Sequence, residues 1–129
     1  MAAKSSYLAK AFLRKVFKNQ DFSVSTVYVG ATIAGSEISG GGYARVATAV
    51  EDWTEPVDDG AGGEQTTYTQ DVLFPKATAA WGTVNGFIVA DAPSGGNILY
   101  GPCALSTPVP INANDQLRFD ANQLVVHEA

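Results

Sequence analysis

The residues with the most evident chemical potential are a single histidine, a glycine-rich run and a group of acids. His127 is the sole histidine of the 129-residue chain and stands two residues from its end. A Ser-His-Asp site would need a partner serine, and no serine occurs in a G-x-S-x-G context. Chain ends also fray unless packing holds them. We therefore expect His127 to be a surface or edge-strand histidine.

A glycine-rich run and an acidic run elsewhere suggest two hypotheses, a phosphate-binding loop and a calcium site. Residues 35–42 resemble a phosphate loop in glycine content only, because they lack the G-K-[ST] ending and the strand-to-helix context. Residues 51–64 contain six acids, and Asp58, Asp59, Glu55 and Glu64 could supply oxygen ligands to calcium. The EF-hand spacing is missing. The sequence therefore favours a structural glycine loop and a solvated acidic loop.

Three further features leave enzymatic or ligand-binding alternatives open. Glu51 and Asp52 are adjacent, but neighbours in a strand point to opposite faces, which disfavours paired glycosidase chemistry. Trp53 and Trp81 could form a sugar platform, although packing or an interface anchor is favoured, and Trp53 is kept as a candidate partner contact. Cys103 is the sole cysteine, so it is expected to be a buried small hydrophobe. No catalytic residue, metal site or cofactor is predicted.

A helix over residues 5–17, ending near Lys18, is the element expected to position the positive charge. At about 100° per residue, apolar side chains occupy one half of the helix and basic side chains the other. The apolar half contains Leu8, Ala9, Phe12, Leu13, Val16 and Phe17. The basic half contains Lys10, Arg14, Lys15 and Lys18, which are the candidate partner contacts. We expect the apolar half to seal the rest of the domain and the basic half to face an acidic protein surface.

The remainder of the chain has the alternation and turn residues typical of β-strands. The predicted strands cover residues 22–30, 43–50, 65–74, 81–91, 97–105, 115–119 and 123–127. Turns are expected at residues 94–97 and 120–122, with bulges near Gly86 and Pro102. This spacing predicts a mainly β fold, an antiparallel β-sandwich or barrel with one N-terminal amphipathic α-helix, as a single domain over residues 1–129.

Charge is distributed unevenly along the chain. Lys4 and the four helix cations are five of the eight basic residues, and the remainder carries 3 basic and 13 acidic residues, a formal balance of −10. An acidic body disfavours nucleic-acid binding. No apolar run approaches the roughly 20 residues of a membrane span, so no membrane partner is expected. With one cysteine and no N-x-[ST] sequon, folding in a cytoplasm is expected.

Several motifs, taken in order, resemble those of small tailed-bacteriophage virion proteins known as tail fibre or capsid fibre proteins. The motifs are S-x-Y-L-x-x-x-F/L-L in residues 5–17, T-V-Y-V-G at 26–30, E-I-S-G-G-G-Y-A-R-V at 37–46, L-F-P-x-A-T-A-x-W-G-T-V at 73–84, G-G-N-I-L-Y-G at 95–101 and D-Q-L-R-F at 115–119. Together they cover most of the chain. The short segment 31–36 and the acidic insert 51–64 depart from the family pattern.

The resemblance implies a non-enzymatic virion structural protein, assembled in the host cytoplasm, and supplies no catalytic residues. The sequence contains neither heptads nor a second domain, which favours a capsid decoration or cement protein of short-fibre type. A tail-associated fibre or receptor-binding module is the alternative, and a carbohydrate-binding module is a less favoured one. Expected partners are copies of itself, for instance as a trimer, and other virion proteins such as the major capsid protein or a tail protein.

Overall fold

The computed structural model describes residues 4–128 and begins with the predicted helix, α1 (Ser6–Phe17). Ser5 caps it, because its hydroxyl oxygen accepts a hydrogen bond from the Leu8 N–H at 3.1 Å. Arg14 and Lys15 lie in the last turn, where cations suit the helix dipole. The helix prediction is confirmed at both ends, because its signals are local.

The rest of the described chain is almost entirely β-structure, and every strand pairing in it is antiparallel. The elements are β1 (Val27–Ile33), β2 (Ser36–Glu37), β3 (Val46–Thr48), the 3₁₀ turn η1 (Val50–Asp52), β4 (Val57–Asp58), β5 (Glu64–Thr67), β6 (Val72–Leu73), β7 (Gly82–Ala90), β8 (Ile98–Ile111), β9 (Arg118–Phe119) and β10 (Val125–Glu128). The predicted fold class, mainly β with antiparallel sheets and one N-terminal helix, is confirmed.

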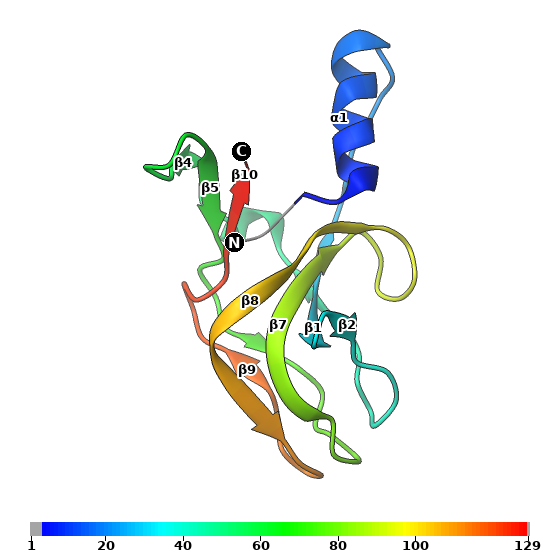
Figure 1. Cartoon of the computed structure of the whole chain (residues 1–129), viewed down its shortest axis with the longest axis vertical. Helices are drawn as coiled ribbons and strands as arrows, with labels where there is room; N and C mark the ends of the chain where they lie inside the picture. The colour runs from blue at the N-terminus through cyan, green and yellow to red at the C-terminus, as the bar shows by residue number, and fades with distance from the viewer. Residues whose placement is uncertain (1–3, 129) are drawn as a thin grey trace.

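Three sheets make up the β-domain (Figure 1). The largest has the order β2-β1-β7-β8, with β3 also pairing to β1. A three-stranded sheet has the order β10-β5-β4, and β6 pairs with β9 in a two-stranded sheet. No hydrogen-bonded strand pair within residues 4–128 joins one of these sheets to another, so the arrangement is closer to a sandwich than to a closed barrel.

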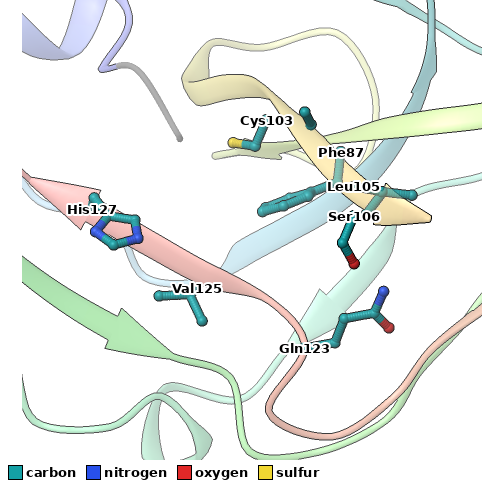
Figure 2. Close-up of a pocket in the computed structure, with 8 residues that line it drawn as sticks. Phe87, Cys103, Leu105, Ser106, Gln123, Val125 and His127 are labelled. Atoms are coloured by element: carbon teal, nitrogen blue, oxygen red, sulfur yellow. The ribbon is translucent and has the colours of Figure 1, made fainter. Parts of the chain in front are cut away.

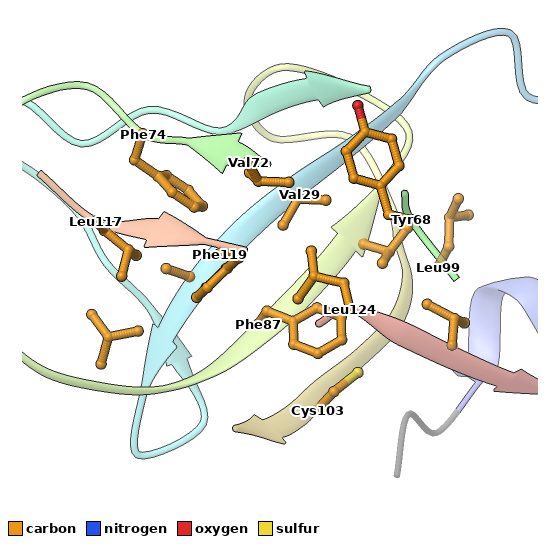
Figure 3. Packing of buried hydrophobic residues seen from close by; sticks show 14 of the residues in the cluster. Val29, Tyr68, Val72, Phe74, Phe87, Leu99, Cys103, Leu117, Phe119 and Leu124 are labelled. Atoms are coloured by element: carbon orange, nitrogen blue, oxygen red, sulfur yellow. The ribbon is translucent and has the colours of Figure 1, made fainter. Parts of the chain in front are cut away.

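One hydrophobic core collects side chains from all three sheets (Figure 3). Phe119 on β9 lies 6.3 Å from Phe87 on β7 and 5.4 Å from Phe74, measured between ring centroids. Cys103 is 2% exposed within this cluster, as predicted, and burial raises the pKa of its thiol to about 11. The small sheets therefore cover one face of the large sheet.

Several predicted strand boundaries are wrong because tertiary contacts override local pattern. The strand expected at residues 22–30 begins only at Val27, since Phe22 packs instead against the rings of Tyr7 and Phe12 on the helix, with centroids 6.3 and 6.0 Å apart. The strand expected at 43–50 is reduced to β3. The run at 65–74 is divided between β5 and β6, which belong to different sheets.

The long β7–β8 hairpin contains both predicted bulges. Register shifts occur between Val84 and Gly86 and again between Phe87 and Val89, opposite the chain around Pro102. Gly86 is required at its position, because a Cβ there would lie 2.5 Å from the Thr32 hydroxyl oxygen. The strand predicted at residues 97–105 is longer than expected, since β8 continues to Ile111.

Candidate functional site

The sole histidine lies on β10, at the edge of its sheet, as predicted. Its Nδ1 is 3.3 Å from Asp59 Oδ2, and it lines a hollow of about 220 Å³ together with Ser106 and Gln123 (Figure 2). In Figure 2 Ser106 points toward Gln123 and away from His127. No hydrogen bond joins Ser106 to His127 in the described chain, so the geometry of a nucleophilic triad is not formed.

The acidic loop is closed by its own backbone. Asp58 Oδ1 accepts from the Gly60 N–H at 2.7 Å, and Asp59 Oδ1 accepts from the N–H groups of Ala61 at 2.7 Å and Gly63 at 3.1 Å. These backbone bonds, followed by His127, hold the pKa of the Asp59 carboxyl below its usual range. Within residues 4–128 no three His, Cys, Asp or Glu side chains gather as a metal-ligand set.

A buried ionic cluster of Glu37, Tyr43 and Arg45 lies at the large sheet. Arg45 binds both carboxylate oxygens of Glu37, through Nε and Nη2 at 2.8 Å each, and its side chain is only 5% exposed. The Tyr43 hydroxyl donates to Glu37 Oε2 at 2.6 Å and accepts from the Ala31 N–H at 3.0 Å. The Glu37 carboxylate, the Arg45 guanidinium, the Tyr43 hydroxyl and the Ala31 N–H therefore all have hydrogen-bond partners here. We call Glu37, Tyr43 and Arg45 the Glu37 cluster.

Burial and hydrogen bonding act together on the pKa values of this cluster. Burial alone would raise the pKa of Glu37, but the bonds from Arg45 and Tyr43 outweigh it and lower that pKa. Burial and the neighbouring Glu37 carboxylate both raise the pKa of Tyr43 above its ordinary value. The bond to Glu37 raises the pKa of Arg45. Near neutral pH the cluster holds a bidentate ion pair and a neutral phenol.

The Glu37 cluster also joins segments that are distant in the sequence. Arg45 Nη1 donates to the carbonyl oxygens of Ala92 and Gly95, each at 2.9 Å, which holds the β7–β8 loop. A Cβ on Gly30 would lie 2.7 Å from the Tyr43 hydroxyl oxygen and 2.9 Å from Glu37 Oε2. The T-V-Y-V-G, E-I-S-G-G-G-Y-A-R-V and G-G-N motifs therefore meet here and serve the framework of the fold.

Both tryptophans are used inside the domain. Trp81 Nε1 donates to the Gly41 carbonyl oxygen at 2.8 Å, and a Cβ on Gly41 would come within 2.9 Å of the indole. Trp53, the candidate partner contact, is half-buried, donates its indole N–H to Thr48 Oγ1 at 2.9 Å and packs 5.0 Å from the Tyr68 ring. The structure places Trp53 beside a small apolar hollow of about 180 Å³ and apart from the helix cations.

The start of α1 is fixed firmly to the β-domain. The Ser5 N–H donates to the Leu99 carbonyl oxygen at 2.8 Å, and Lys4 forms an ion pair with Glu128. The Tyr100 hydroxyl donates to the other Glu128 oxygen at 2.8 Å. The Lys4 ammonium also lies 5.1 Å from the centre of the Phe12 ring. These contacts tie the two ends of the described chain to β8.

The second half of α1 is not packed on the domain (Figure 1). Leu8 and Ala11 are buried, whereas Leu13, Val16 and Phe17 are 58%, 72% and 76% exposed. The prediction that the whole apolar half seals the domain is therefore wrong. The reason is geometric: β8 contacts the beginning of the helix, and the last turns extend beyond the sheet. We call Leu13, Val16 and Phe17 the helix stripe.

The candidate cations lie on the exposed sides of the same helix. Lys10, Arg14, Lys15 and Lys18 are all exposed. Lys15 Nζ lies 3.5 Å from Asp21 Oδ1, but both side chains are largely in solvent, so this pair is weak. In the described part of the chain, Lys10, Arg14 and Lys18 enter no ion pair. The four predicted cations are therefore exposed on the same helix as the helix stripe.

Sequence reasoning missed a second surface, in the acidic loop. Val50 and Val57 are 63% and 54% exposed and lie among Glu51, Glu55 and Asp58, which are also exposed. We call residues 50–58, together with Glu64 on the adjoining strand β5, the acidic segment. A valine flanked by acids was a readable signal, but without the fold it is equally compatible with a buried strand residue.

The described chain is a small antiparallel β-domain with one projecting, partly apolar helix. None of the described helices has the length and apolar character needed to cross a membrane. The model of the family described as Podophage GP4 fiber I protein gp80 matches residues 3–127, and the chain belongs to this family. It is therefore a phage structural fibre protein and a component of the virion, which confirms the resemblance to phage fibre proteins. No curated protein matches the chain.

Proposed function

We propose that this protein is a non-enzymatic structural component that decorates the capsid exterior. The observation that carries the proposal is α1: a compact domain presents one short helix whose second half, with the helix stripe, extends clear of the sheets. Exposed apolar patches of this kind mark protein contacts. With 12 residues the helix is about 18 Å long, which suits local attachment to a shell.

A tail-associated fibre or receptor-binding module is the second candidate. The family description as a fiber protein favours it. Fibres that reach a distant receptor gain their length from coiled coils or repeats, and the 129-residue sequence contains neither. That observation supports decoration over the tail. In either location the major capsid protein or a tail protein would be the surface to which the protein attaches.

The enzymatic and carbohydrate-binding alternatives gain little support from the geometry. Trp53 and Trp81 donate their indole N–H groups within the protein and pack against Tyr68 and Tyr43. A sugar platform requires an aromatic face open to solvent. Glu51 lies on an exposed 3₁₀ turn, and its pair with Asp52 has no enclosing pocket of its own among the described hollows.

The number of copies per virion tests the proposal. Purified virions would be digested together with isotope-labelled peptides of this protein, of the major capsid protein and of a tail protein, and all three quantified in one run. Hundreds of copies, in fixed ratio to the major capsid protein, would support decoration of the shell. Copies in the single digits or low tens, in fixed ratio to the tail protein, would contradict it and favour the tail-associated fibre.

A further inference from the structure

The structure leaves two surfaces of opposite charge exposed on the same chain. The helix stripe presents apolar side chains flanked by Lys10, Arg14 and Lys18. The acidic segment presents Val50 and Val57 flanked by Glu51, Glu55, Asp58 and Glu64. Both surfaces have apolar area that could be buried in a contact, and their charges are opposite, cations on one and carboxylates on the other.

The charges on both surfaces are free to meet a partner. In the part of the chain that the structure describes, Lys10, Arg14 and Lys18 enter no ion pair, and neither do Glu51, Glu55, Asp58 and Glu64. By contrast, the buried Arg45 and Glu37 neutralise each other. Charges inside the framework are thus paired, whereas the charges on these two surfaces are not. This pattern is expected of complementary contact surfaces.

The two surfaces do not meet within one copy. α1 packs on β8. In Figure 1, β4 and β5, which carry part of the acidic segment, lie at the upper left, α1 lies at the upper right, and β10 lies between them. Since the start of α1 is held by Ser5, Lys4 and Leu8, the helix cannot swing onto its own acidic segment without breaking those contacts. A second copy supplies the missing surface in each case.

We propose that α1 of one copy docks, by its helix stripe and flanking cations, on the acidic segment of a second copy. The two surfaces differ, so the contact is heterologous, and it forms a closed ring where the rotation between copies allows closure and an open filament where it does not. The ring is the form proposed for this protein, with each copy contributing α1 to one neighbour and its acidic segment to the other. This inference concerns the isolated protein and holds whether the oligomer is placed on the capsid or on the tail.

Charge reversal of each surface, and then of both, tests this contact. Lys10→Glu with Arg14→Glu reverses the helix, and Glu51→Lys with Glu55→Lys reverses the acidic segment. Lys76→Glu with Arg118→Glu is the control for the helix variant, because it makes the same change in charge at exposed positions elsewhere. Circular dichroism and urea unfolding establish that each variant folds. Light scattering over a concentration series gives the oligomeric state.

The wild-type and control proteins should form the same oligomer, and higher salt should weaken it. Each single reversal should raise the dissociation constant at least ~10-fold, because like charges then face one another. The chain that carries both reversals should recover the oligomer, because every copy again presents opposite charges to its neighbour. This rescue distinguishes a direct contact from a general effect of charge.

Three outcomes would overturn the inference. The first is a monomeric wild-type protein at every concentration, with the helix reversal nevertheless excluded from virions, which would identify another virion protein as the partner. The second is an oligomer that survives the helix reversal. The third is a folded doubly reversed chain that remains monomeric. The copy number of the wild-type protein in the virion is measured independently of these three outcomes, so the proposed function is judged separately.

Discussion

Two regions of this molecule use the same residue types in opposite ways. In the Glu37 cluster, the Arg45 side chain is 5% exposed and donates to both Glu37 oxygens and to two backbone carbonyls. On α1, the Arg14 side chain is exposed and enters no ion pair among the described residues. The first region fixes the fold, and the second is available to a partner. Residue type alone does not distinguish these roles.

A similar contrast exists within α1 itself. Leu8 is 3% exposed against the domain, whereas Leu13, five residues later, is 58% exposed. Both leucines belong to the apolar half of the helix, and the difference arises from how far the sheet extends along the helix axis. The helix is anchored at its beginning and presented at its end. Substitutions that separate stability from association can therefore test the whole comparison.

The largest effect is expected at Arg45. Arg45→Met removes the cation, leaves the Ala92 and Gly95 carbonyls without their donor, and leaves the Glu37 carboxylate with only the Tyr43 hydroxyl. Breaking a buried pair in this way costs about 3–5 kcal/mol of unfolding free energy. Arg14→Met is the control and should change it by less than about 0.5 kcal/mol. Urea unfolding measures both, and equal effects would contradict the assignment of Arg45 to the framework.

The next largest effect is expected at Leu8. Leu8→Ala leaves a cavity between α1 and the domain and should lower the unfolding free energy by about 3 kcal/mol. Leu13→Ala, the same substitution on the same helix, should stay within about 0.5 kcal/mol. Thermal unfolding followed by circular dichroism checks the pair. A comparable loss at Leu13 would mean that the second half of α1 also packs on the domain.

The elements with local signals were predictable from the sequence. The helix ends were correct because Ser5 caps its own helix, and β7 was correct because its flanking turns and glycine bulge are encoded nearby. The division of residues 65–74 was not predictable, since β5 pairs with β10 and β6 with β9, whose positions depend on the whole fold. Non-local pairing with β7 also decided that β8 continues past residue 105 to Ile111.

The candidate contacts were predictable only in part. The exposure of Lys10, Arg14, Lys15 and Lys18 was predictable because helical periodicity determines which side they occupy, and their contact with a partner stays a prediction. Trp53 was chosen for its type, and the structure shows its indole N–H and ring used internally. Periodicity also could not tell which turns of the helix meet the sheet, because both halves of α1 are amphipathic. The family motifs correspond to residues of the framework, such as the Glu37 cluster, and not to the candidate contacts.

A smaller effect on the unfolding free energy is expected from pH, and it arises from the titrating groups of the Glu37 cluster. The pKa of Glu37 is lowered from 4.5, so its contribution is complete above that value and is lost as pH falls through the lower folded pKa. The pKa of Tyr43 is raised from 10.0, so its contribution is complete below that value and is lost as pH rises. Unfolding free energy should therefore decline on both sides of a neutral plateau.

Variants of the same cluster identify the groups responsible. Glu37→Gln should reduce the slope of the acid limb, and Tyr43→Phe that of the alkaline limb, because each removes one titrating group. Part of the alkaline limb should remain, because burial and Glu128 also raise the pKa of Tyr100. Asp59 also has a lowered pKa, so Asp59→Asn should remove a separate part of the acid limb. Urea midpoints measured at a series of pH values provide the check. An unchanged profile in Glu37→Gln would show that the cluster does not govern acid stability.

The smallest effect on stability, and the clearest on association, is expected at Phe17. Phe17→Ser should change the unfolding free energy by less than about 0.5 kcal/mol, because the side chain is 76% exposed. The same change should weaken the oligomer, because it removes the largest apolar side chain of the helix stripe. Leu73→Ser is the control, since Leu73 is 52% exposed on β6 and belongs to neither the helix stripe nor the acidic segment. Light scattering over a dilution series should show dissociation of the Phe17 variant at concentrations where the Leu73 variant and the wild type remain associated, and equal behaviour of all three would remove the helix stripe from the interface.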